Sequence, residues 1–128
     1  MANLLLVDDD RDLTDTLAEL LRGAGHDVRT AGDGDVALRT LHGAPLPDVV
    51  VLDIDMPIMS GPTMAHEMLL HDAGEEKIPV MLVSGRADLE QVAGRMGTPY
   101  FLAKGTNLKE FLVVLARAVR ERLAPSSA

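Results

Sequence analysis

The feature that most constrains this chain is the alternation of short strand-like runs with amphipathic stretches along its whole length. The pattern predicts five strands, at about residues 4–7, 27–31, 49–52, 79–83 and 100–103. The run at 49–52 is the most β-branched of them, which is typical of a central strand buried on both faces. Strands that alternate with helical patterns predict an α/β fold, a parallel sheet with helices on both faces.

Apolar residues between the predicted strands recur at helical spacing. Five helices are expected, at about residues 13–24, 36–41, 64–69, 87–96 and 108–119. The fourth has the weakest pattern and is predicted to be short. Asn107 and Glu110 are spaced to form a capping box at the start of the last helix.

Composition narrows the class of protein. The 128 residues suit one domain, predicted over residues 1–124, with residues 125–128 as a disordered tail or linker stub. A net charge of −8 opposes direct binding to nucleic acid or to anionic membranes. The chain has no cysteine and shows neither a signal peptide nor a run of apolar residues long enough to span a membrane, so a cytoplasmic location is expected.

The ends of the predicted strands carry the residues that point to chemistry. In an open parallel sheet, ligands bind beyond the carboxyl ends of the strands. Four carboxylates, one hydroxyl and one ammonium are expected to converge there: Asp8, Asp9, Asp53, Asp55, Ser84 and Lys104. Clustered carboxylates repel one another and need a cation, and all-oxygen ligands suit Mg²⁺ or Mn²⁺. With a cation bound, a carboxylate there could act as a nucleophile toward phosphorus while the lysine and serine hold phosphoryl oxygens.

Four segments in this order and spacing resemble the receiver domain of two-component response regulators. They are residues 5–10 (LLVDDD), 51–57 (VLDIDMP) with Gly61 beyond, 79–85 (PVMLVSG) and 100–104 (YFLAK). The resemblance covers nearly the whole chain. It implies a flavodoxin-like (βα)5 fold, a doubly wound parallel sheet with strand order 2-1-3-4-5.

The resemblance also implies a role for each matching residue. Asp53 matches the phosphoacceptor, and Mg²⁺ would be held by Asp8, Asp9, Asp53 and the backbone carbonyl of Asp55. Lys104 matches the lysine that pairs with the phosphoryl group, Ser84 the hydroxyl that follows it, and Phe101 the aromatic switch.

The activity that the resemblance implies is the acceptance of a phosphoryl group from a sensor histidine kinase or a phosphotransfer protein. The chain would be no enzyme beyond its self-catalysed phosphorylation and dephosphorylation. Its output would be a conformational shift of the face formed by the fourth helix, the last strand and the last helix. That shift would act on a downstream protein or drive homodimerisation, in a chain that is either a stand-alone receiver or one domain of a longer protein.

Three departures from the family pattern bear on the site. Gly105 follows Lys104 where the family usually has a proline in a cis peptide. The loop here is therefore expected to be either trans or strained, and the sequence leaves the direction of the Lys104 side chain open. Gly85 would leave the phosphoryl site more open. Asp55 and Arg86 could pair across its mouth as modulators.

Two other functions remain open from the sequence. Asp53-Ile54-Asp55 also resembles the nucleophile motif of haloacid dehalogenase-like phosphatases, but in that family the motif usually lies on the first strand. A receiver-like interaction scaffold that is never phosphorylated is the other alternative. Gly105 and the short fourth helix favour it, whereas the complete set of site residues opposes it.

Overall fold

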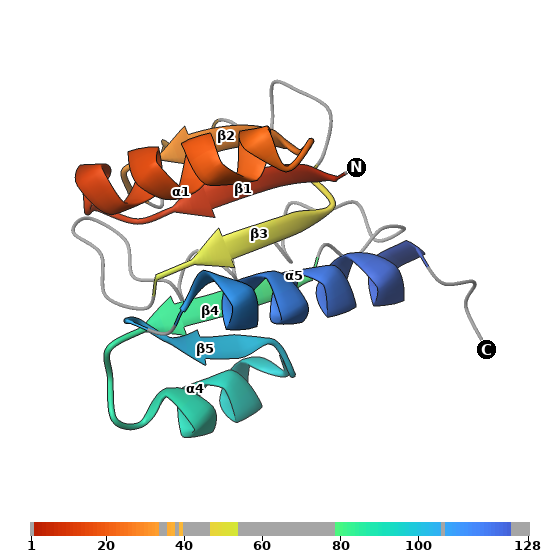
Figure 1. The fold of residues 1–128 in the computed structure, drawn as a ribbon. Helices are drawn as coiled ribbons and strands as arrows, with labels where there is room; N and C mark the ends of the chain where they lie inside the picture. Colours follow the sequence, from red (N-terminus) through yellow and green to blue (C-terminus); the bar gives the residue numbers. More distant parts are fainter. Residues whose placement is uncertain are drawn as a thin grey trace.

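The computed structural model of the chain describes residues 2–33, 36–37, 39, 47–53, 79–105 and 107–123, with only the backbone of residues 122 and 123. The described elements are β1 (Asn3–Val7), α1 (Arg11–Gly23), β2 (Asp27–Ala31), β3 (Val49–Leu52), β4 (Val80–Ser84), α4 (Leu89–Met96), β5 (Phe101–Ala103) and α5 (Leu108–Leu123). The five strands form one sheet in the order β2-β1-β3-β4-β5, and every pair of neighbouring strands is parallel (Figure 1). This order confirms the predicted α/β, flavodoxin-like fold.

The strand bounds agree with the sequence pattern to within one residue. β2 and β3 lie at the predicted positions, and β1 begins one residue earlier because Asn3 pairs with Asp27. β4 is displaced by one residue toward the carboxyl end. Ser84, expected to end this strand, belongs to it because it pairs with Ala103 of β5.

Hydrogen bonds and backbone torsions mark the start of α1 and the end of α4. The Asp10 side chain accepts a hydrogen bond from the Leu13 amide at the start of α1, at 3.1 Å. α4 is short, as predicted, and begins at Leu89 rather than at residue 87, because residues 87 and 88 form a turn. It ends at Met96 and is capped by Gly97, which has a left-handed φ of 79°.

Two predicted helices fall largely or wholly outside the described residues. Of the one predicted at 36–41, only residues 36, 37 and 39 are described, and they are helical. The Asp33 side chain accepts a hydrogen bond from the Val36 amide at 2.9 Å, which is the geometry of an N-cap. The helix predicted at 64–69 and the tail predicted at 125–128 lie outside the described residues, so the domain bounds stay predictions.

The core consists of two layers of apolar side chains, one on each face of the sheet. Leu4, Leu6 and Val51 point toward α1 and α5, which lie on the same face (Figure 1). Leu5, Leu52 and their neighbours on β4 point to the opposite face and pack against α4. Burial on both faces explains why β1 and β3 are almost wholly apolar, and it makes the sheet a rigid base for the side chains at its carboxyl edge.

None of the helices in the described ranges has both the length and the apolar character needed to cross a membrane.

Candidate functional site

The sheet's own hydrogen bonds carry three predicted site residues to its carboxyl edge. The amide of Asp8 donates to the Ala31 carbonyl at 3.1 Å, just beyond the last residue of β1. In the same way the amide of Asp53 donates to Val7 at 3.0 Å, and that of Lys104 donates to Ser84 at 3.0 Å. Each bond continues a strand pairing by one residue, so the backbone positions of these side chains are set by the sheet and not by mobile loops.

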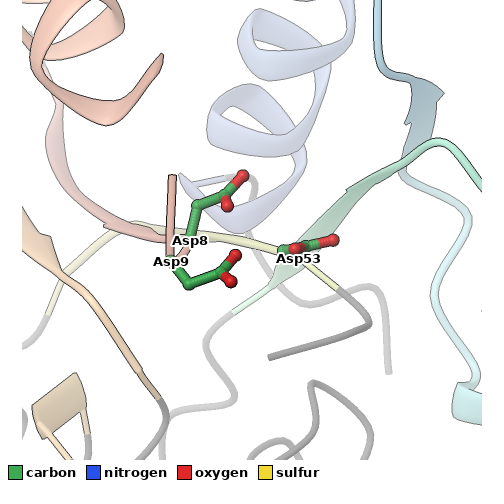
Figure 2. Close-up of side chains that lie close together, drawn as sticks. All are labelled: Asp8, Asp9 and Asp53. Atoms are coloured by element: carbon green, nitrogen blue, oxygen red, sulfur yellow. The ribbon is translucent and has the colours of Figure 1, made fainter. Parts of the chain in front are cut away.

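Three carboxylates meet at this edge. Asp8 and Asp53 are only 8% and 6% exposed, whereas Asp9 is exposed to solvent. Ligand oxygens of the three side chains lie within 4.8 Å of one another, at the ends of β1 and β3 (Figure 2). The Asp8 carboxylate also accepts a hydrogen bond from the Asp10 amide at 3.0 Å, which fixes its orientation.

The Lys104 ammonium lies against two of these carboxylates. Its Nζ is 3.1 Å from Asp8 Oδ2 and 3.4 Å from Asp53 Oδ2. Burial acts to lower the pKa of Lys104, but the hydrogen bonds and charges of Asp8 and Asp53 outweigh it, so the pKa is raised above its usual value. The lysine is therefore a fixed positive charge that joins the ends of β1, β3 and β5.

The donor set of the cluster fits a hard divalent cation. Its ligands are all carboxylate oxygens, and in the described part of the chain three carboxylates face one ammonium. This excess of negative charge at short range is the electrostatic situation that Mg²⁺ binding relieves. The fourth predicted ligand, the backbone carbonyl of Asp55, lies outside the described residues.

Ser84 is the last residue of β4, its carbonyl accepts the hydrogen bond from the Lys104 amide, and it is 2% exposed. Its hydroxyl accepts a hydrogen bond from the Arg86 amide at 3.2 Å. The Arg86 guanidinium donates to both carboxylate oxygens of Asp88, at 2.8 and 3.1 Å. The hydrogen bond from Arg86 lowers the pKa of Asp88.

Asp88 was missed by reasoning from the sequence, although an arginine and an aspartate two residues apart before a predicted helix could have indicated the pair. The predicted partner of Arg86, Asp55, lies outside the described residues. The pair of Arg86 with Asp88 places the arginine side chain at the start of α4.

Phe101 and the loop after β5 complete the edge. Phe101 is half-buried and packs on the α4 side of the sheet with the cluster that contains Leu82 and Val92. The peptide between Lys104 and Gly105 is trans, and Gly105 has a left-handed φ of 87°. Of the two alternatives left open by the sequence, the structure has the trans loop, and the Lys104 ammonium still contacts the carboxylates.

Strand order, acidic cluster and strand-end lysine together define a receiver domain. The sequence profile described as "Response regulator receiver domain" matches residues 4–116, and the chain belongs to this family. It is thus the receiver domain of a two-component response regulator.

Individual relatives agree with this assignment. The chain is 35% identical to the transcriptional regulatory protein CpxR homolog of Haemophilus influenzae over 129 aligned residues, which cover 99% of the chain and 54% of that protein. Among solved structures, the receiver domain of NtrX from Brucella abortus superposes with a TM-score of 0.78 and 32% identity, covering 91% of this chain and 98% of that one. The chemotaxis protein CheY4 of Vibrio cholerae gives 0.82 and 28%, covering 92% and 98%. The chain spans about half the length of the curated relatives it matches.

Proposed function

We propose that the chain accepts a phosphoryl group on Asp53 from the phosphohistidine of a sensor histidine kinase or a phosphotransfer protein. The observation that carries the proposal is the environment of Asp53: a buried carboxylate beside a second carboxylate and within 3.4 Å of a lysine ammonium. Membership of the receiver family supports the same assignment.

The step that follows is a direct transfer. An oxygen of the Asp53 carboxylate forms a bond to phosphorus while the bond from phosphorus to the histidine nitrogen breaks. The imidazole leaves with the bonding electron pair and takes up a proton. The phosphoryl group is later lost by hydrolysis. Water attacks phosphorus, the bond to Asp53 breaks, and the free carboxylate and inorganic phosphate are formed.

Asp8, Asp9 and Asp53, with the backbone carbonyl of Asp55, would hold Mg²⁺ or Mn²⁺. When bound, the cation supplies positive charge that stabilises the oxygens of the transferring phosphoryl group. The Lys104 ammonium already contacts an Asp53 oxygen and would donate to a phosphoryl oxygen attached there.

Ser84 and Phe101 would carry the readout. The Ser84 hydroxyl accepts from the Arg86 amide, so its own proton can be donated to a phosphoryl oxygen on Asp53. Movement of Ser84 would change the packing of Phe101 against α4. We expect a population shift of the face formed by α4, β5 and α5, read by a downstream protein or by a second copy of the chain.

The proposed activity makes the chain a signalling switch and no enzyme with multiple turnovers on an outside substrate. The phosphatase alternative has lost its support, because the chain belongs to the receiver family. The unphosphorylated scaffold remains the alternative outcome of the experiment.

The experiment is intact mass measurement after incubation with acetyl phosphate, with and without Mg²⁺. The wild type is compared with Asp53→Asn and with Asp48→Asn. Asp48 is the matched control because its carboxylate accepts a hydrogen bond from the Asn3 amide, away from the cluster.

Uptake of one phosphoryl group by the wild type and Asp48→Asn, with Mg²⁺ only, and none by Asp53→Asn is the expected result. No uptake by a folded wild type would overturn the proposal in favour of the scaffold. Rapid consumption of acetyl phosphate without a stable adduct would revive the phosphatase.

A further inference from the structure

The turn between β5 and α5 must reverse the chain within four residues, 104–107. Both ends of this turn are held. At one end the Lys104 amide donates to Ser84 at 3.0 Å. At the other, Asn107 caps α5 by accepting hydrogen bonds from the Glu110 amide on its side chain, at 2.9 Å, and from the Phe111 amide on its carbonyl, at 3.2 Å.

Gly105 makes this reversal with a φ of 87°, a conformation that residues with a side chain adopt only under strain. A β-carbon added at Gly105 would meet no heavy atom within 4 Å. The requirement for glycine is therefore torsional and not steric. If φ at this position became negative, the rotation would have to be absorbed between two anchored ends, and that stretch includes the Cα from which the Lys104 side chain extends.

The Lys104 side chain must reach two carboxylates at the same time. Its ammonium contacts Asp8 at 3.1 Å and Asp53 at 3.4 Å, two carboxylates that belong to different strands. Both carboxylates are buried and are held by the ladders of β1 and β3, so they cannot follow a displaced lysine.

We infer that Gly105 is a positioning residue, whose left-handed conformation directs the Lys104 ammonium to the two buried carboxylates. Its consequence for phosphoryl transfer rests on the proposed function, whereas the placement of the ammonium does not. A trans peptide followed by a left-handed glycine is thus this chain's own way to aim the lysine.

The test compares three variants at or near this turn with a control elsewhere. Gly105→Ala imposes the torsional strain without a steric clash, and Gly105→Asn is the rescue variant because asparagine tolerates the left-handed region better than alanine. Gly97→Ala is the matched control: Gly97 has a φ of 79° and equally open surroundings, but it follows α4 and lies before β5. Lys104→Met shows the effect of removing the ammonium altogether.

Three measurements are made on each variant. The first is the affinity for Mg²⁺ alone by calorimetric titration, and the second is the rate of phosphorylation by acetyl phosphate at saturating Mg²⁺. The third is the ¹⁵N signal of the Lys104 ammonium, which is readily assigned because the chain has only three lysines.

Both Gly105→Ala and Gly97→Ala should lose stability to urea through torsional strain, and Gly105→Ala should lose more, because the displaced ammonium no longer pairs with Asp8 and Asp53. Gly105→Ala alone should phosphorylate at least ~10-fold more slowly, because small misplacements of a catalytic group are costly. It should also bind Mg²⁺ about threefold or more tightly, since a displaced ammonium no longer neutralises the carboxylates. Its Lys104 signal should move to the position of a solvent-exposed lysine. Gly105→Asn should stay close to wild type, and Gly105→Ala should add little to Lys104→Met in the double variant.

The inference is overturned if Gly105→Ala keeps the wild-type Mg²⁺ affinity and Lys104 signal, or if its effects add fully to those of Lys104→Met. Should Gly105→Ala fail to fold, a folded Gly105→Asn with a displaced Lys104 signal would overturn it equally. If the wild type takes up no phosphoryl group, the proposed function fails, while the Mg²⁺ affinity and the Lys104 signal still decide the role of Gly105.

Discussion

The two ends of the sheet differ in how their polar groups are paired. At the amino end, the Ala2 amide donates to His26 Nδ1 at 3.1 Å, and the Asn3 amide donates to the Asp48 carboxylate at 2.8 Å. Both of these acceptors meet an uncharged backbone donor.

At the carboxyl end, two buried carboxylates face each other and share one ammonium, with a third carboxylate beside them. Like charges at this distance cost stability, and the sheet does not require them for its strands to pair, because the described residues at the amino end form no such cluster. The difference indicates that the amino end serves the fold and that the carboxyl end keeps a destabilising arrangement for chemistry.

The largest expected effect comes from removing the ammonium at the carboxyl end. Lys104→Met leaves Asp8 and Asp53 buried without the ammonium, and we expect a loss of about 2 kcal/mol in the free energy of unfolding. This loss is below the usual cost for a fully buried pair because the Lys104 side chain is 31% exposed. Urea unfolding measures the loss, and millimolar Mg²⁺ should restore most of it. Lys109→Met, at an exposed lysine of α5, is the control, and an equal loss there would contradict the comparison.

Alkaline pH tests an ionisable group near the amino end of β5. Burial, followed by the hydrogen bond to Glu121, raises the pKa of Tyr100 from 10.0 to about 12. The neutral phenol is favoured in the fold, so this contribution is complete below pH 10 and is lost as pH rises through about 12. Tyr100 is the only tyrosine and the chain has no tryptophan, so tyrosinate absorbance reports this residue alone.

In the same titration, Glu121→Gln should return the pKa of Tyr100 only part of the way, since burial remains, whereas Glu110→Gln should leave it unchanged. The raised pKa of Lys104 has an effect of the same sign: its contribution to stability is also lost as the pH rises above the usual pKa of a lysine. A Tyr100 that titrates at the ordinary value in the wild type would show that this contact does not form.

A third prediction sets one carboxylate of each end against the other. Asp48→Ala leaves the Asn3 amide without its acceptor and should cost about 1–2 kcal/mol. Asp9→Ala removes an exposed member of the acidic cluster and should leave stability in the absence of divalent cations unchanged or slightly higher. Thermal unfolding of both variants in a chelating buffer measures the difference, and a destabilised Asp9→Ala would break the comparison.

The smallest effect is expected at the exposed pair of Arg86 and Asp88, whose side chains are both 42% exposed. Arg86→Ala should leave stability within error, because exposed ion pairs contribute little. Loss of the Arg86 hydrogen bond should raise the pKa of Asp88 toward its usual value, which a carboxyl NMR titration would detect. A double-mutant cycle of dephosphorylation rates with Asp55→Ala tests the predicted pair of Arg86 and Asp55, and independent effects would exclude it.

Strand positions and one helix cap could be predicted from the sequence, because they depend on residues that are close together in the chain. The strand at 49–52 and the cap at Asn107 depend on neighbours within a few residues, and the structure has both where they were predicted. The start of α4 was predicted two residues too early because Arg86 binds Asp88 across the turn, a contact that helical periodicity does not contain.

The sequence by itself determined the order of strands and helices, and it identified the acidic and basic residues that follow the strands, because both depend on hydrophobic periodicity and on position relative to a strand end. Only the tertiary structure decided how these residues meet. The pairing of separate strands brings the Lys104 ammonium to 3.1 Å from Asp8 and 3.4 Å from Asp53, and we infer that a trans peptide and a left-handed glycine direct the lysine there. The meeting of these side chains depends on contacts between strands that are distant in the sequence, and the periodicity of a single segment does not contain those contacts.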